Sequence, residues 1–255
     1  MRCLRKDFRH TSLYLKRFLN RHRWPLLISG LAILVTAVLG INPHDQAIVN
    51  LVRGDRTRFL HQLSGEIGHW GDFLQYNLGL AGLIWLVGRF RKSRWLQRLA
   101  VVTLVASIFA GITCNLFRFT SGRPRPKAQT VDGFYGVPGA FRGWNYQSFP
   151  SGHTSTAFGT ATPLLVNGGP GGVVAMAFSS SVAWARIYRN QHYPTDVLVG
   201  AWLGIVFGLA TGLPLRRVRL RLRRDRKRYR RAARRNQPLF GNRTRSSTQL
   251  DRATL

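Results

Sequence analysis

Long apolar segments alternate with polar, often basic, connections along most of this 255-residue chain. Four of the segments approach the length of about 20 residues that a helix needs to cross a bilayer core of ~30 Å; they span residues 25–41, 73–87, 99–117 and 197–213. Two shorter segments, 154–166 and 173–188, are rich in Gly, Ala, Ser and Thr, which suits helices buried among other helices. The pattern predicts an all-α fold, a polytopic membrane helix bundle with about six transmembrane helices.

Shorter features complete this predicted architecture. The run Asn-Gly-Gly-Pro-Gly-Gly at 167–172 is rich in helix breakers, so the two short segments beside it should form a helical hairpin. Residues 1–20 mix apolar with basic side chains, and residues 47–67 repeat apolar positions at roughly helical spacing. Both patterns are typical of interfacial amphipathic helices, which lie on the membrane surface.

The formal net charge of +30 is unevenly distributed along the chain. It defines a basic leader at 1–24, a six-span body at 25–215, and a basic tail at 216–255 whose composition predicts disorder. A basic leader before an apolar segment also occurs in cleavable signal peptides, but five further spans favour an uncleaved first helix. A nucleic-acid binder can be equally basic, yet it would not contain this series of apolar runs, so we expect no nucleic-acid partner.

The positive-inside rule predicts the orientation. With six spans, the leader, the basic loop at 89–98 and the tail fall on one side, which is then the cytoplasm. Both termini are therefore expected to be cytoplasmic, with the tail against anionic inner-leaflet lipids, in what looks like a bacterial inner membrane. The connections at 42–72, 118–153 and 189–195 would face outward.

Three short stretches in or beside those outer connections carry the side chains that phosphate chemistry requires: guanidiniums, imidazoles, a hydroxyl and a carboxylate. One of them, the second along the chain, is Pro150-Ser151-Gly152-His153. It lies where a helix should begin, with Ser151 as its N-cap. A helix N-terminus offers free N–H groups to a phosphate, Gly152 permits close approach, and His153 projects from the first turn.

The third stretch contains Arg186, His192 and Asp196. Pro194 is favoured at the first position of a helix, which puts Asp196 at its third. From there a carboxylate can reach back as in a capping box, hold one nitrogen of His192 and leave the other free as a nucleophile. Simpler readings are a snorkelling arginine, a solvated histidine and an ordinary helix cap.

The first stretch runs from Arg118 to Pro126. Its prolines at 124 and 126 favour an extended backbone, so Arg123 and Arg125 should project in opposite directions. The simpler reading is a basic loop that touches lipid head groups.

Together the stretches resemble the type-2 phosphatidic acid phosphatase superfamily, lipid phosphate phosphatases that share a site with vanadium haloperoxidases. The family pattern is Lys, six residues, Arg-Pro; then Pro-Ser-Gly-His; then Ser-Arg, five residues, His, three residues, Asp. Residues 150–153 match the second element fully, and Arg125 with Pro126 matches the end of the first. Two positions depart from the pattern, because Arg118 replaces Lys and Ala185 replaces Ser.

The resemblance implies a metal-independent phosphatase with no cofactor. His192 would attack phosphorus to form a phosphohistidine, Asp196 would fix its tautomer, and His153 would protonate the leaving oxygen. The phosphate oxygens would be held by the remaining motif residues: Arg118, Arg125, Ser151, Gly152 and Arg186.

The expected substrate is a lipid phosphate, and the sequence does not choose among phosphatidic acid, phosphatidylglycerol phosphate, a prenyl diphosphate and a lipid A phosphate. An envelope lipid of the last two kinds is favoured by the bacterial topology. The alternative is a membrane protein or transporter of the same fold that binds lipid phosphates without hydrolysing them, which the substitution at Arg118 keeps open. Aromatic residues at 134–146 could line a substrate entrance, but an interfacial belt is favoured. The sequence does not indicate the oligomeric state.

Overall fold

The computed structural model describes residues 44–54 and 57–235, with scattered positions between 17 and 35. Every regular element within these residues is a helix. The helices are α3 (His44–Val52), α4 (Arg58–Trp70), the π-helix η1 (Phe73–Leu78), α5 (Gly79–Phe90), α6 (Arg94–Ser121), the 3₁₀ turns η2 (Pro126–Ala128) and η3 (Trp144–Tyr146), α7 (Gly136–Ala140), α8 (Gly152–Gly168), α9 (Pro170–Tyr188) and α10 (Pro194–Arg235). The leader and most of the predicted first span lie outside the described residues.

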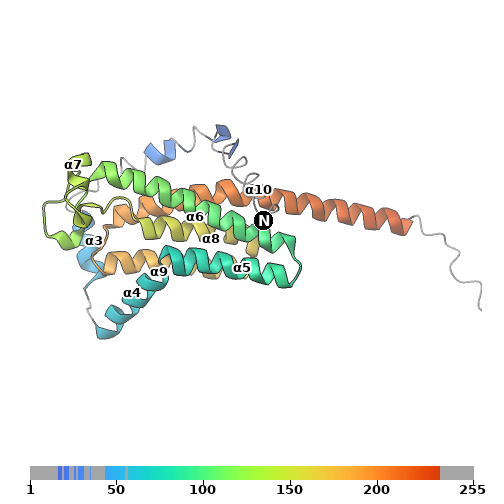
Figure 1. The fold of residues 1–255 in the computed structure, drawn as a ribbon, viewed down its shortest axis with the longest axis horizontal. Helices are drawn as coiled ribbons and strands as arrows, with labels where there is room; N and C mark the ends of the chain where they lie inside the picture. Colours follow the sequence, from blue (N-terminus) through green and yellow to red (C-terminus); the bar gives the residue numbers. More distant parts are fainter. Residues whose placement is uncertain are drawn as a thin grey trace, which may run out of the picture. The chain divides into compact units, whose positions relative to one another are not determined.

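The bundle is built from helical hairpins that lie side by side (Figure 1). Ser93 caps α6 through its side chain, which accepts from the Leu96 N–H, and α5 packs back along α6. The predicted turn at 167–172 separates α8 from α9, with Gly169 at a positive φ of 66°. Leu99, Ala161, Leu164 and Ala175 form a core cluster between α6, α8 and α9. The hairpin prediction is therefore confirmed.

A stripe of glycines brings α10 against α8. Gly200, Gly204, Gly208 and Gly212 recur every four residues, so they share one helix face. A Cβ atom at any of them would lie 2.4–2.8 Å from atoms of Ser151 or of α8. This small-residue packing is typical of helices in membranes, and it fixes the start of α10 beside the start of α8.

The flanking segments differ from the predictions in two respects. The amphipathic segment at 47–67 forms two helices, α3 and α4, because the chain leaves the helical conformation at Arg53 and Gly54. The tail is not disordered from residue 216, because α10 continues to Arg235 through residues that are mostly Arg and Leu, both good helix formers. The chain divides into compact units at 1–216 and 217–255. Residues 236–255 lie outside the described part.

Two helices among the described residues are long and apolar enough to cross a membrane. They lie within Arg94–Ala128 and Pro194–Tyr229, and they correspond to the predicted spans at 99–117 and 197–213. The predicted total of about six spans stays a prediction.

Candidate active site

Direct hydrogen bonds join the three predicted stretches at the start of α8 and α10. The Ser151 N–H donates to the carbonyl of Asp196 over 3.0 Å. Arg118 donates to the Pro150 carbonyl over 3.4 Å, and Arg125 donates to Oε1 of Gln191, next to His192, over 2.8 Å. The structure thus brings together segments that are up to 78 residues apart in the chain, between Arg118 and Asp196.

His192 is buried, with 1% of its surface exposed. Its Nδ1 lies 2.7 Å from the backbone carbonyl oxygen of Ser148. Because a carbonyl can only accept, Nδ1 must carry the proton, and Nε2 keeps a free lone pair. Burial lowers the pKa of His192 to about 4, and the nearby charges of Arg125 and Arg118 act in the same direction, whereas Asp196 opposes them. The ring is therefore a neutral imidazole at physiological pH.

Asp196 positions His192 indirectly, which corrects the sequence-based expectation of a direct bond. The nearest Asp196 oxygen lies 3.7 Å from Nδ1 of His192, too far for a hydrogen bond. That oxygen instead accepts from the Ser148 hydroxyl over 2.6 Å and from the Tyr193 N–H over 2.9 Å. The second bond is the predicted capping-box contact. Asp196 therefore holds Ser148, whose carbonyl holds the imidazole.

Arg123 is a buried residue of the site that the motifs did not single out. Its guanidinium is fully buried and binds three carboxylates: Asp196 at 2.6 Å, Asp132 at 2.6 Å and Asp45 at 2.8 Å. Tyr193 covers one face of the guanidinium, 4.1 Å from ring centre to Cζ. Arg123 thereby ties α3 and the 122–151 loop to the start of α10.

Arg125 takes a separate set of partners from Arg123, in keeping with the predicted divergence of the two side chains. It donates to the carbonyls of Trp144 and Gln147 as well as to Gln191. The Trp144 ring lies 4.2 Å from Cζ of Arg125 and 5.8 Å from that of Arg118. Trp144 is therefore part of the site, and the sequence-based preference for an interfacial role misses this contact.

Arg118 lies in the last turn of α6 and is 8% exposed. Its Nη2 would be only 2.6 Å from a Cβ at position 152, so Gly152 is required for this close contact. Ser151 occupies the N-cap position of α8, but its side chain makes no capping bond, which corrects the prediction. The Ser151 hydroxyl pairs instead with the Thr154 hydroxyl at 2.9 Å.

Arg186, in the last turn of α9, donates to the Gly68 carbonyl in α4 over 2.7 Å. Its Nε is buried, as is the Nε of Arg118, and neither has a hydrogen-bond partner among the described residues. Such unused donors suit an anionic ligand.

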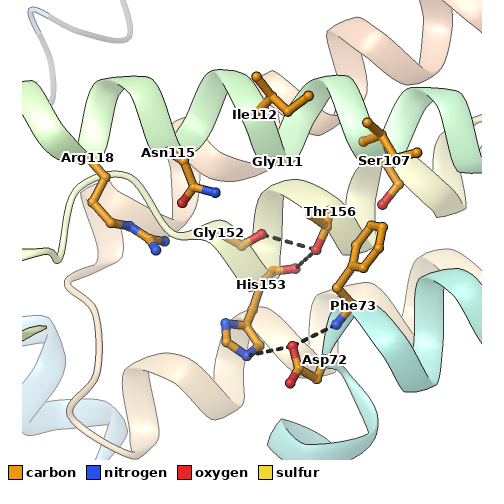
Figure 2. Close-up of a pocket in the computed structure, with 11 residues that line it drawn as sticks. Asp72, Phe73, Ser107, Gly111, Ile112, Asn115, Arg118, Gly152, His153 and Thr156 are labelled. Carbon is orange, nitrogen blue, oxygen red and sulfur yellow. Dashed lines mark hydrogen bonds and ion pairs between the residues drawn. The ribbon is translucent and has the colours of Figure 1, made fainter.

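His153 lies beside a cavity of about 410 Å³ between α6, α8 and η1. Figure 2 shows Arg118, Gly152, His153 and Asp72 around one end, with Phe73, Ile112 and Ser107 farther along. Arg118, Arg125, Arg186 and His192 all interact electrostatically with His153. The two imidazoles and three arginines predicted for the site therefore lie in one neighbourhood. Within the described residues, no group of three or more His, Cys, Asp or Glu side chains could hold a metal ion.

Sequence reasoning missed several contributors, namely Ser148, Gln191, Asp72 and the cluster around Arg123. Ser148 acts through its backbone carbonyl, which leaves no residue-type signal. Asp132 and Asp45 are among only nine acidic residues in the chain. This scarcity of acids between basic blocks is the one sequence signal that could have pointed to the Arg123 cluster.

Known proteins resemble the part of the chain that contains these residues. Residues 99–213 match the family model of the PAP2 superfamily. A lipid A 1-phosphatase of Rhizobium johnstonii is 33% identical over 112 residues, which cover 42% of this chain and 43% of that protein. A lipid A 1-phosphatase of Porphyromonas gingivalis is 30% identical over 122 residues, covering 46% of this chain and 24% of that protein. The chain thus spans less than half the length of these relatives.

The fold is also similar to a solved structure. The transmembrane PAP2-type phosphatidylglycerolphosphate phosphatase of Bacillus subtilis superposes with a TM-score of 0.52 at 21% identity, covering 73% of this chain and 94% of that one. This likeness confirms the all-helical membrane bundle. Fold, motifs and family match agree: residues 99–213 match the PAP2 superfamily, and all three motif stretches from Arg118 to Asp196 lie within them.

Proposed function

We propose that this protein is an integral membrane phosphatase that hydrolyses lipid phosphates through a phosphohistidine intermediate. The observation that carries the proposal is the bond from His192 Nδ1 to the Ser148 carbonyl. It leaves a neutral Nε2 lone pair among arginines that would bind the phosphate, which is the arrangement a nucleophilic imidazole needs.

In the proposed reaction, Nε2 of His192 attacks phosphorus in line with the leaving oxygen. The P–N bond forms as the P–O bond breaks, and protonated His153 gives its proton to the departing oxygen. Water then attacks the phosphohistidine, His153 accepts the proton of that water, and the P–N bond breaks to release phosphate and restore His192.

The phosphate oxygens would be held by the guanidiniums of Arg118, Arg125 and Arg186 and by the N-terminal turn of α8 at Ser151 and Gly152. The unpartnered Nε atoms of Arg118 and Arg186 support this assignment. Because arginine forms bidentate bonds to phosphate, the replacement of the family lysine by Arg118 is compatible with turnover. This is why we favour catalysis over a non-catalytic lipid-phosphate-binding protein or transporter.

The cavity beside His153 suggests a lipid substrate. Its α6 residues, from Ser107 to Arg118, lie on one helix face and extend about 16 Å along the axis at ~1.5 Å per residue. Phe73, Ile108 and Ile112 supply apolar surface for the chains of a lipid. The names of the relatives favour a lipid A phosphate, ahead of phosphatidic acid, phosphatidylglycerol phosphate and a prenyl diphosphate.

The proposed location is the inner membrane of a bacterium, with both termini in the cytoplasm and the site facing the periplasm. The distribution of basic residues supports this orientation. A reporter fused after Leu255 should behave as cytoplasmic, and one inserted at residue 130 as periplasmic. The opposite pattern would reverse the orientation.

Phosphate release by the purified full-length chain tests the function. With EDTA present, the wild-type protein should release phosphate from at least one of the four lipid phosphates, and His192→Gln should not. Orthovanadate, which mimics pentacoordinate phosphorus, should inhibit. Binding of these lipids without any phosphate release would favour the non-catalytic alternative.

A further inference from the structure

His153 has a carboxylate partner that the family motifs do not contain. Nε2 of His153 lies 3.6 Å from Oδ1 of Asp72, which precedes η1. The same carboxylate oxygen accepts from the Phe73 N–H over 2.7 Å. Asp72 is thus held as the N-cap of η1 and lies beside the imidazole at one end of the cavity, as Figure 2 shows.

We propose that Asp72 is a positioning residue for His153, acting on the imidazole through its negative charge at 3.6 Å rather than through a short hydrogen bond. This inference rests on the proposed function, because it assigns Asp72 to the protonation of the leaving group. Asp72 would orient the ring and stabilise its protonated form.

The electrostatic surroundings of His153 make such a partner necessary. Four groups that are or can become positive act on its ring: Arg118 from α6, Arg125 from the following loop, Arg186 from α9 and His192 from the loop before α10. All of them oppose a further positive charge on the imidazole. A general acid must nevertheless carry its proton when substrate is bound. The negative charge of Asp72 acts in the required direction, and it also interacts with Arg186.

The ring geometry assigns separate tasks to the two nitrogens. Nε2 faces Asp72, whereas Nδ1 lies on the side of Arg118 in Figure 2. In the imidazolium, His153 would keep the proton on Nε2, which faces Asp72. The proton on Nδ1 would pass to the leaving oxygen as the P–O bond breaks. His153 is then neutral, and Nδ1 regains a proton from the water that hydrolyses the phosphohistidine.

The simpler reading is that Asp72 only caps η1. Asparagine caps helices about as well as aspartate, so Asp72→Asn keeps the cap and removes the charge. The side chain of Asp72 is 54% exposed, so solvent weakens the pair, and we expect a moderate effect of about 10- to 100-fold, at or below the usual contribution of general acid catalysis.

The experiment compares two leaving groups in the purified full-length protein. The alkoxide of a lipid phosphate monoester is a poor leaving group and needs a proton to depart. 4-Nitrophenyl phosphate releases a stable phenolate, which departs without one. Asp72→Asn should lower kcat on the lipid phosphate about 10- to 100-fold and on 4-nitrophenyl phosphate by less than about threefold. The alkaline limb of the kcat–pH profile on the lipid should also move to lower pH.

Two further variants sharpen the result. Glu66→Gln, a matched change at an exposed carboxylate on α4, should behave as wild type on both substrates. In a His153→Ala background, Asp72→Asn should have little further effect, because the two residues act as one unit.

Equal losses on both substrates with an unshifted pH profile would reduce Asp72 to a structural cap and overturn the inference. So would wild-type kcat in Asp72→Asn. Either result leaves the proposed function intact, provided that the wild-type protein releases phosphate. An inactive wild-type protein would refute the proposed function, and this inference with it.

Discussion

The imidazole of His192 donates its Nδ1 proton to the backbone carbonyl of Ser148, while Asp196 binds the hydroxyl of the same serine. The carboxylate therefore fixes the nucleophile through one intermediate residue. A main-chain acceptor cannot rotate away as a side chain can, so the tautomer is set by the path of the 147–151 segment.

Arg123 should be essential for stability. Removing its guanidinium leaves Asp45, Asp132 and Asp196 buried without their common partner, and breaking a buried ion pair in this way costs about 3–5 kcal/mol. Arg123→Met should lower the thermal unfolding midpoint strongly in detergent. The exposed Arg91→Gln, at the C-cap of α5, is the matched control and should melt like wild type. An Arg123→Met protein that also melts like wild type would show that the cluster contributes no net stability.

The pH dependence should reflect the low pKa of His192. Its pKa is about 4 in the folded protein, against about 6.5 for an ordinary histidine. Between these values the unfolded chain binds more protons, so stability rises with pH. Thermal unfolding from pH 4 to 7 should show this rise, and His192→Gln should reduce it. Activity that depends on neutral His192 should fall only as the pH approaches about 4. Loss centred near pH 6.5 would show that the imidazole is not shielded as described.

Gly152→Ala should impair catalysis more than folding. The new Cβ would lie 2.6 Å from Nη2 of Arg118, the movable end of a long side chain, so Arg118 would be displaced while the helix persists. We expect phosphate release to fall about tenfold or more, since a lost charged contact is worth roughly 1.5–3 kcal/mol. Gly82→Ala, which has open space around it, should keep full activity and serves as the control. Full activity in Gly152→Ala would argue that Arg118 does not hold the phosphate.

Local sequence signals predicted much of the architecture. Hydropathy located the helices that became α6, α8, α9 and the first half of α10, and the breaker run around Gly169 located their hairpin. The same signals failed where a break or an extension depended on few residues. The spacing of apolar positions does not reveal the break at Arg53 and Gly54. The high charge of residues 217–235 predicts disorder, although arginine is a good helix former.

The site was predictable where residue types and spacing carry the chemistry, and not where tertiary contacts do. His153, His192 and the arginines of the motifs could be identified because phosphate transfer needs those groups at fixed spacings. Arg123 could not, since its carboxylate partners lie up to 78 residues away at Asp45. The Ser148 carbonyl and the Asp72–His153 pair depend on the path of the backbone, which no residue pattern encodes.

Chemical trapping of the intermediate tests the central claim most directly. When the purified protein is mixed with a ³²P-labelled lipid phosphate and quenched in base within one turnover, label should appear on His192, stable to alkali and released by acid. His192→Gln should carry no label, and His153→Ala should accumulate label if the substrate has a good leaving group. Substrate turnover without a labelled protein, or label on a residue other than His192, would contradict the account.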